Sequence, residues 1–181
     1  MPIHIAMLRG INVGGYKKVP MKQLQRSVAA LGFEQVKTYI QSGNLIFRAK
    51  GTPSDICRKI ERKILEEFGF EVPVVSRTPA EILAVINGNP FSSAKGFDLA
   101  KLCVAFLSGP PESAGLKKLD PLVTKSDRYH CCGKEVYLYC PSGASETKLT
   151  NNAIEKALSL SATSRNWNTV NKLYEMSCEY K

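Results

Sequence analysis

The sequence lacks the features that would place the protein in a membrane or a secretory pathway. No apolar run among its 181 residues approaches the roughly 18–20 residues that a membrane-spanning helix needs. The N-terminal residues Met1–His4 have neither the basic nor the apolar region of a signal peptide. We therefore expect a cytoplasmic protein with no membrane partner.

Residues that carry catalysis are also scarce. The chain has two histidines: His4 falls inside a predicted strand, and His130 lies beside Cys131 without a motif that would make the two a catalytic pair. No two carboxylates are placed for general acid–base chemistry. The glycines match neither the Walker A nor the dinucleotide-binding spacing. The sequence thus leaves open whether the protein is an enzyme, and it identifies no catalytic residue.

The cysteines do not form a metal-binding pattern. The chain has six, Cys57, Cys103, Cys131, Cys132, Cys140 and Cys178, which should be reduced in a cytoplasmic protein. Zinc sites use paired ligands such as C-x-x-C, whereas Cys131 and Cys132 are adjacent and would point to opposite faces of a strand. We expect buried structural thiols, with no metal and no cofactor.

Basic residues are in excess. The chain carries 25 lysines and arginines against 16 acidic residues, a formal charge of +9. Residues 1–90 hold 13 basic and 7 acidic residues (+6), which leaves 12 and 9 (+3) for residues 91–181. This balance favours polyanionic partners such as nucleic acid. The same charge also keeps a small protein soluble, so both interpretations stay open.

The first half predicts a ferredoxin-like unit. Ile3–Leu8 indicates a strand, Met21–Leu31 a helix that stops at Gly32, and Thr52 the cap of a helix that stops at Gly69. The other predicted strands are 36–40, 45–48 and 72–76, the first two joined by the turn Gln41–Asn44. The order is β-α-β-β-α-β. Thr78, followed by Glu81, then opens a further helix with a capping-box pattern.

The pattern restarts after the turn-rich stretches 87–90 and 92–96. Predicted strands cover 102–106, 128–132, 135–140 and 162–165, with helices over 112–118, from Asn152 to Leu158, and after residue 166. Asn152, followed by Glu155, opens the second of these helices with a capping-box pattern. The string Val75–Thr78 is echoed by Thr163–Asn166. We therefore predict an α+β fold of two ferredoxin-like halves, 1–90 and 97–181, each followed by an extra helix, with largely antiparallel sheets.

This topology predicts a candidate site in the first half. In a split βαβ unit, the loop after the first strand and the turn between the second and third strands lie at the same end of the sheet. The basic, glycine-rich loop and the turn should converge and bind a phosphate-bearing ligand, either nucleic acid or a nucleotide. The predicted ligand-binding residues are Arg9, Gly10, Asn12, Gly14, Gly15, Lys17, Lys18, Gln41, Ser42 and Asn44. The alternative is that the loop only turns a corner and Asn44 only holds the hairpin.

A second candidate patch lies near the C-terminus. It consists of Arg165, Asn166, Trp167 and Lys172. The basic residues flank a predicted helix N-terminus, which attracts anions, and Trp167 could stack on a base. The alternative is that Trp167 packs in the core and Asn166 caps the helix.

Three strings carry a family resemblance: Leu8–Gly15 (LRGINVGG), Tyr39–Asn44 (YIQSGN) and Thr163–Lys172. Together they make the chain resemble a widespread bacterial family known as domain of unknown function 1697. The resemblance implies a cytoplasmic α+β protein of ferredoxin-like halves and brings no activity with it. At the level of fold analogy alone, acylphosphatases hold phosphate with an arginine after the first strand and an asparagine on a neighbouring strand. Arg9 and Asn44 are the corresponding candidates.

Three hypotheses for function follow. The first is a binding module for a phosphate-bearing ligand at the edge formed by loops 9–19 and 41–44. The second is a small phosphoryl or acyl-phosphate hydrolase in which Arg9 clamps the oxyanion and Asn44 positions water. The third is a protein-interaction module. We favour the first; the sequence gives no oligomeric state.

Overall fold

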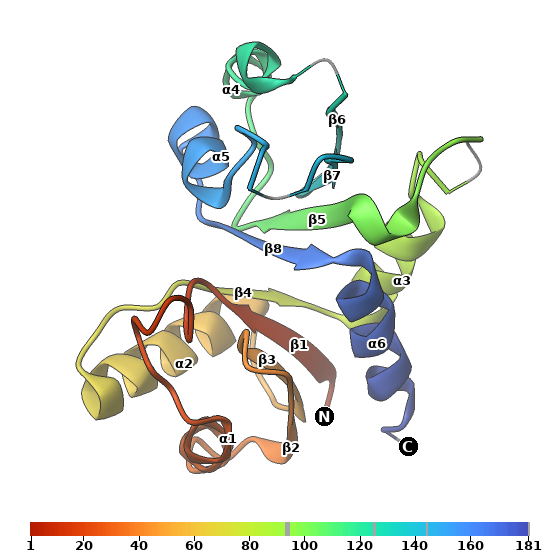
Figure 1. Cartoon of the computed structure of the whole chain (residues 1–181). Helices are drawn as coiled ribbons and strands as arrows, with labels where there is room; N and C mark the ends of the chain where they lie inside the picture. The colour runs from red at the N-terminus through yellow and green to blue at the C-terminus, as the bar shows by residue number, and fades with distance from the viewer. Residues whose placement is uncertain (93–94, 125, 144, 181) are drawn as a thin grey trace. The chain divides into compact units, whose positions relative to one another are not determined.

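The computed structural model describes residues 1–92, 95–124, 126–143 and 145–180 (Figure 1). By their contacts these residues form two compact units, unit 1 (Met1–Leu83 with Lys172–Lys181) and unit 2 (Ala84–Asn171). Unit 1 contains β1 (Ile3–Leu8), α1 (Met21–Ala29), β2 (Glu34–Tyr39), β3 (Asn44–Arg48), α2 (Pro53–Phe68), β4 (Val74–Arg77) and the start of α3 (Pro79–Asn87). Unit 2 contains the end of α3, η1 (Leu99–Lys101), β5 (Leu102–Leu107), α4 (Ser113–Lys117), η2 (Asp120–Leu122), β6 (Arg128–Cys132), β7 (Glu135–Tyr139), α5 (Asn151–Leu158), β8 (Ala162–Asn166) and the start of α6 (Trp167–Cys178).

Each unit has a four-stranded antiparallel sheet with the ferredoxin-like strand order. The order is β2-β3-β1-β4 in unit 1 and β6-β7-β5-β8 in unit 2. The predicted fold class, two ferredoxin-like halves each followed by an extra helix, is confirmed. The predicted halves, 1–90 and 97–181, follow the order of the repeats along the chain, and their boundaries stay a prediction. The compact units are divided differently, because the last residues of the chain contact unit 1.

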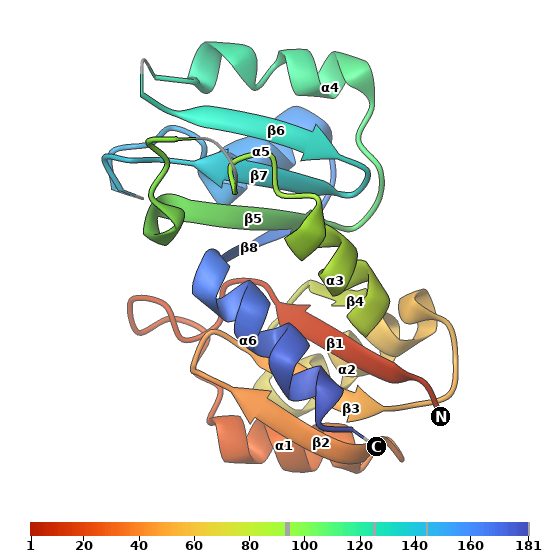
Figure 2. The ribbon, with the colours of Figure 1, turned by 90° about the vertical axis from the view of Figure 1, so that its right-hand side faces the viewer.

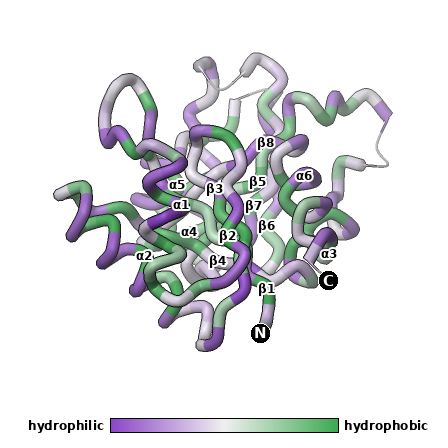
Figure 3. The backbone as a smooth tube through the Cα atoms, turned by 90° about the horizontal axis from the view of Figure 1, so that it is seen from below, coloured by the Kyte–Doolittle hydropathy of each residue, from purple (hydrophilic) through white to green (hydrophobic). Residues whose placement is uncertain are grey.

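The core of unit 1 lies between the sheet and helices α1 and α2. Leu24 and Val28 of α1 and Ile60 of α2 are fully buried with β1 and β3 residues in one hydrophobic cluster. Figure 3 shows hydrophobic residues concentrated along the strands and hydrophilic ones along the outer sides of these helices. Strand β1 is buried on both faces from His4 to Leu8, as its unbroken apolar run predicts.

The terminal segment of α6 covers the other face of the unit 1 sheet (Figure 2). The Tyr180 hydroxyl donates to the backbone carbonyl oxygens of Gln35 (2.7 Å) and Ile46 (2.8 Å). In unit 2, the Tyr137 hydroxyl donates to the Val85 carbonyl oxygen of α3 at 2.7 Å. The helix after the first repeat, α3, thus ends in unit 2, and the helix after the second repeat, α6, ends in unit 1.

Local signals place most helix starts where the sequence predicts them. The Thr52 hydroxyl accepts a hydrogen bond from the Asp55 backbone N–H (3.2 Å) at the start of α2. Thr78 and Glu81 form the reciprocal capping box of α3, with the Glu81 carboxylate 2.7 Å from the Thr78 backbone nitrogen. The expectation at α5 is wrong: the capping side chain is Thr150, which accepts from the Ala153 N–H (3.2 Å). A threonine two residues earlier provides the same chemistry as the predicted Asn152.

The sequence echo between the halves corresponds to an equivalent structure. Arg77 ends β4 opposite Ile5, the third residue of β1, and Arg165 in β8 lies opposite Val104, the third residue of β5. Each guanidinium donates from Nη1 to the carbonyl oxygen of the preceding serine at 2.9 Å. Both arginines are buried. Two repeats that share this register and this bond are consistent with duplication of one unit.

None of the helices formed by the described residues is long and apolar enough to cross a membrane. The turn-rich stretch 92–96 includes residues 93 and 94, which lie outside the described residues.

Candidate functional site

The loop after β1 and the turn after β2 meet at one end of the unit 1 sheet, as the topology predicts. Asn12 joins them: its Nδ2 group donates to the carbonyl oxygens of Gln41 and Val19, both at 2.9 Å. Its Oδ1 atom accepts from the Val19 backbone N–H at 2.8 Å. Asn12 therefore holds the loop and the turn together. This structural role fits its positive φ of 55°, which asparagine tolerates.

The turn Gln41–Asn44 is packed directly beneath the loop. Gly43 adopts a φ of +80°, and its carbonyl oxygen accepts from the Leu8 N–H at 2.8 Å. A side chain on Gly43 would collide with Ile11, whose Cδ1 atom lies 2.7 Å from the position of a Cβ. Asn44 is fully buried and donates to the Tyr39 carbonyl oxygen and the Ser42 hydroxyl. These contacts favour a structural role for Asn44 over contact with a ligand.

We call residues 9–19 the glycine loop. Its two sides are paired by hydrogen bonds from the Asn12 N–H to the Lys17 carbonyl oxygen (3.1 Å) and from the Tyr16 N–H to the Val13 carbonyl oxygen (3.0 Å). Gly14 and Gly15 form the tip with positive φ angles of 57° and 81°. The loop is thus a short, internally bonded projection whose form depends on glycine at the tip.

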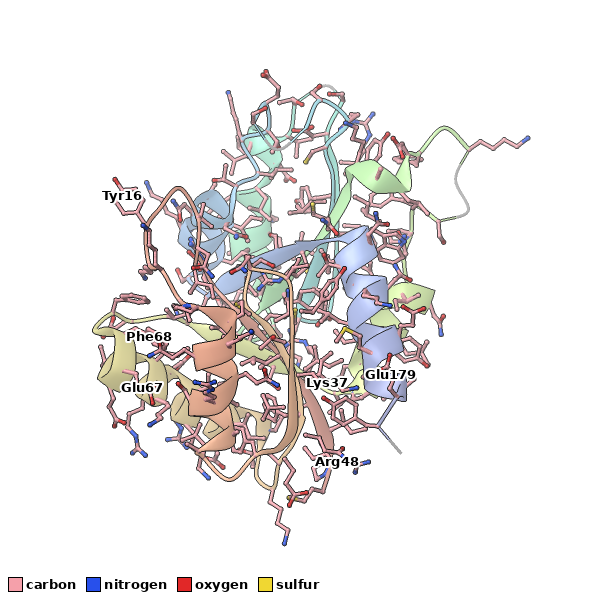
Figure 4. The ribbon with its side chains drawn as sticks, turned by 60° about the horizontal axis from the view of Figure 1, so that its bottom comes forward. Tyr16, Lys37, Arg48, Glu67, Phe68 and Glu179 are labelled. Atoms are coloured by element: carbon pink, nitrogen blue, oxygen red, sulfur yellow. The ribbon has the colours of Figure 1, made fainter. Side chains whose placement is uncertain are left out.

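The tip presents two large apolar side chains to solvent. Tyr16 is 79% exposed and Val13 is 65% exposed, and Figure 4 shows Tyr16 directed outward from the loop. Ile40, beside the turn at the same end of the sheet, is also exposed. Tyr16 is not among the ligand-binding residues predicted from the sequence. Its position between Gly14-Gly15 and Lys17-Lys18 was the available signal, because loop segments run over the protein surface.

The predicted cations differ in their settings. Lys17 donates from Nζ to the Glu71 carbonyl oxygen (2.6 Å) and lies 6.0 Å from the centre of the Phe70 ring, which fixes the base of the loop. Lys18 is exposed. Arg9 is half-buried, and its backbone N–H donates to the Pro73 carbonyl oxygen at 2.9 Å. All three lie on the glycine loop, so its surface carries positive charge beside the exposed tyrosine.

The remaining members of the predicted set complete the same end of the sheet. Gly10 has a φ of +69° and has open space where a side chain would stand. Gln41 is exposed and Ser42 is half-buried, where its hydroxyl accepts from the Asn44 amide at 3.1 Å. The structure therefore places the ten predicted residues on the glycine loop and on the turn that Asn12 joins to it, with the asparagines inside and the lysines and Gln41 on the surface.

The second candidate patch is only partly exposed, because two of its four residues, Arg165 and Trp167, are buried. Trp167 is 8% exposed, and Arg165 is buried, which lowers the pKa of its guanidinium to about 10. The Asn166 side chain accepts from the Thr169 N–H at 2.8 Å, as a helix cap does. Lys172 is exposed and forms an ion pair with Glu175 at 2.7 Å. The alternative interpretation, a core tryptophan and an asparagine cap, fits these positions.

The cysteines are less uniformly buried than expected. Cys132 and Cys178 are exposed, and the other four are half-buried. Burial raises the pKa of the Cys57 and Cys103 thiols to about 11, so they are protonated at neutral pH. Within the described part of the chain, no group of three or more His, Cys, Asp or Glu side chains is placed to hold a metal ion.

Comparison with known proteins identifies the family. The family model described as "Protein of unknown function (DUF1697)" matches residues 1–137. The chain belongs to this family. Among solved structures, the conserved bacterial protein SP0830 from Streptococcus pneumoniae has a similar fold, with a TM-score of 0.78, 23% sequence identity, and coverage of 97% of this chain and 98% of that one. No curated protein matches the chain. Membership of DUF1697 thus agrees with the fold and leaves the function to be argued from the site.

Proposed function

We propose that the protein binds a phosphate-bearing ligand of the nucleic-acid class through the glycine loop. Tyr16 would stack on a base, and Lys17 and Lys18 would contact neighbouring phosphates. The observation that supports this most is the 79% exposure of Tyr16 at the tip of a loop whose base is held by hydrogen bonds. Proteins that bind single-stranded nucleic acids with little sequence preference use exposed aromatic rings beside positively charged side chains.

The rigidity of the loop matters for affinity. A mobile loop would lose conformational entropy on binding, whereas the bonds of Asn12 and the Val13–Tyr16 pairing already hold this one. The overall charge of +9, with its larger share in residues 1–90, acts in the same direction by attracting a polyanion. The proposal therefore rests on a preformed surface rather than on charge alone.

The test is binding of a fluorescently labelled single-stranded oligonucleotide of about ten nucleotides, followed by anisotropy at several salt concentrations. Tyr16→Ala should weaken binding by about 1–3 kcal/mol, and Tyr16→Phe should retain most of it, because stacking needs the ring and not the hydroxyl. Lys18→Gln should lower the salt dependence by about 0.7 in the slope of log K against log salt. Lys59→Gln, an exposed lysine on α2, is the matched control. Absence of binding at low salt, or binding that neither loop variant changes, would refute the proposal.

One observation favours a second candidate, a protein-interaction surface. Val13, Tyr16 and Ile40 are exposed apolar side chains at one end of the unit 1 sheet, and such groups are enriched where proteins bind each other. The two functions separate experimentally. Binding of a protein partner would be lost with Val13→Ser and Ile40→Ser, and its affinity would depend little on salt. The nucleic-acid proposal predicts instead that these variants bind the oligonucleotide with almost unchanged affinity.

The hydrolase hypothesis has less support. It needs Asn44 to position water, but Asn44 is fully buried and its amide donates within the turn. No observation at the site favours it over binding.

A further inference from the structure

Strand β6 forms one edge of the unit 2 sheet, where it pairs with β7 alone (Figure 2). The pairing is regular, with an unbroken register from Arg128 opposite Tyr139 to Cys132 opposite Glu135. A regular edge strand presents backbone N–H and C=O groups that another strand can bind. The proposed function, which concerns the glycine loop of unit 1, does not use this edge.

The turn between β6 and β7 shows which backbone groups point outward. Gly133, with a φ of 61°, begins a two-residue turn that the pair Cys132 and Glu135 closes. Residues of an antiparallel pair bond to the neighbouring strand alternately, and Cys132 bonds to β7 as the closing residue. The N–H and C=O groups of Tyr129 and Cys131 therefore point away from β7. None of the described residues forms a hydrogen bond with these backbone groups.

The corresponding edge of unit 1 is protected. Strand β2 occupies the same place in the strand order as β6. Its pairing with β3 has a register shift between Glu34 and Lys37, and the Tyr180 hydroxyl donates to the Gln35 carbonyl oxygen at 2.7 Å. Bulges and covering segments are means by which proteins prevent a sheet edge from pairing with another strand. The two repeats share the strand order, and β6 lacks both features.

The side chains of β6 suit pairing with a second copy of the chain. Arg128, His130 and Cys132 are exposed and lie on one face of the strand. Antiparallel pairing of two β6 strands centred on His130 places Arg128 of each copy opposite Cys132 of the other. Glu135 follows on the same face, because it lies opposite Cys132 in β7. Two strand spacings, roughly 10 Å, then separate the backbones of Arg128 and Glu135, a distance that their two side chains span across the small cysteine.

From this edge we propose that two copies of the chain associate through β6 and join their unit 2 sheets into one continuous sheet. The two-fold axis passes beside His130, because a strand that pairs with itself in antiparallel orientation does so symmetrically. Backbone hydrogen bonds join Tyr129 of each copy to Cys131 of the other. An ion pair between Arg128 and Glu135 forms twice. An interface built on one strand pair belongs to the small and transient class, so dimers form only at roughly 10 µM and above.

The test is sedimentation velocity of the full-length protein from about 10 µM to about 1 mM. A salt concentration of about 0.15 M screens the long-range repulsion between two chains that each carry +9. The protein should shift from monomer toward dimer as the concentration rises. A monomer at every concentration would overturn the proposal and leave the edge to a strand of another protein.

Charge reversal tests the partner contacts. Arg128→Glu places two pairs of carboxylates together and should weaken association about tenfold, and the added substitution Glu135→Arg should restore it. Lys156→Glu, at an exposed lysine of α5, is the matched control, because it changes the net charge equally and lies outside β6. A dimer that Arg128→Glu and Lys156→Glu weaken equally, or that neither weakens, would refute the placement of Arg128 beside Glu135.

A cysteine in place of His130 tests the register. The two residues at the axis form a non-hydrogen-bonded pair with Cα atoms about 4.5 Å apart, within the range of a disulfide. Oxidised glutathione accepts the two electrons and is reduced to two glutathione molecules as the bond forms. His130→Cys should give a covalent dimer on a non-reducing gel, whereas the unmodified protein and Lys156→Cys should not. Equal cross-linking of His130→Cys and Lys156→Cys, or none in either, would refute the register.

Discussion

His4 is a buried histidine that the fold supports poorly, and it offers a sharp test of the energetics of unit 1. It lies in β1 and is 2% exposed, and neither ring nitrogen has a hydrogen-bond partner within the described structure. Its ring stacks on Phe47 with the centroids 5.9 Å apart. We consider replacement by leucine, which has a similar volume and no polar atoms.

The expected change in the free energy of unfolding follows from two opposing effects. Leaving buried polar atoms without partners costs roughly 1–3 kcal/mol, and His4→Leu removes that cost. The substitution also loses the stacking on Phe47, worth roughly 0.5–1.5 kcal/mol. We expect a net stabilisation of about 1 kcal/mol at pH 8, which corresponds to a rise in melting temperature of about 2–4 °C for a chain of this size.

The pH dependence has a definite sign. Burial lowers the pKa of the His4 imidazole below its ordinary value of 6.5, against smaller opposing effects of the Ala49 backbone and the Glu81 carboxylate. As the pH falls below 6.5, the unfolded chain takes up a proton that the folded chain does not bind, so the folded state loses stability down to the lowered pKa. His4→Leu removes this loss, and its advantage over the unmodified protein should therefore grow between pH 8 and pH 5.

The assay is urea unfolding at both pH values, followed by far-ultraviolet circular dichroism. His130→Gln is the matched control, because His130 is the second histidine of the chain and is exposed in β6. Destabilisation by His4→Leu of more than about 1 kcal/mol at pH 8, a cost typical of lost packing, would refute this prediction. Equal loss of stability in the variant and the unmodified protein on acidification would refute it as well.

Three further predictions concern the candidate site and the chain end. Gly43→Ala should destabilise the protein by roughly 2–3 kcal/mol in urea unfolding, because the φ of Gly43 is +80° and a Cβ there would lie 2.7 Å from the Ile11 Cδ1 atom. Gly69→Ala is the control: its φ is +77° but the space around it is open, so it should cost only about 1 kcal/mol. Equal costs would contradict the packing argument. Asn12→Ala removes three hydrogen bonds that hold the glycine loop, and should cost about 2 kcal/mol and speed amide hydrogen exchange in residues 9–19. Unchanged amide hydrogen exchange would mean that the bonds of Asn12 do not hold the loop. Tyr180→Phe loses bonds to two backbone carbonyls of the unit 1 sheet and should lower the melting temperature by about 2–4 °C; an unchanged value would show that the chain end does not stabilise unit 1.

What the sequence predicted well depends on local chemistry. The caps at Thr52 and Thr78 and the turn at Gln41–Asn44 are set by residues within a few positions of one another, so their patterns can be recognised without a structure. The meeting of the glycine loop and the turn followed from topology, because the strand order fixes which loops share an end of the sheet.

What the sequence could not predict depends on distant packing. Arg165 was a surface candidate by its charge, yet β8 pairs with β5 and buries it. A pocket in unit 2 is lined by residues from Ala100 to Ser164, and no local pattern marks them as neighbours. The contact of Tyr180 with Gln35 joins residues 145 positions apart. Exposure has the same limit, because the outward position of Tyr16 follows from how the whole loop is held.

The duplication supplies the strongest reason to assign a function to the glycine loop. The two repeats share strand order, the register of the fourth strand and the bond from Arg77 or Arg165 to the preceding serine. They differ at the connection after the first strand, which spans residues 9–20 in unit 1 and only residues 108–112 in unit 2. A short connection is therefore sufficient for this fold. The longer one is held by its own hydrogen bonds and exposes Tyr16, so its length is best explained by the surface that it presents and not by the need to join β1 to α1.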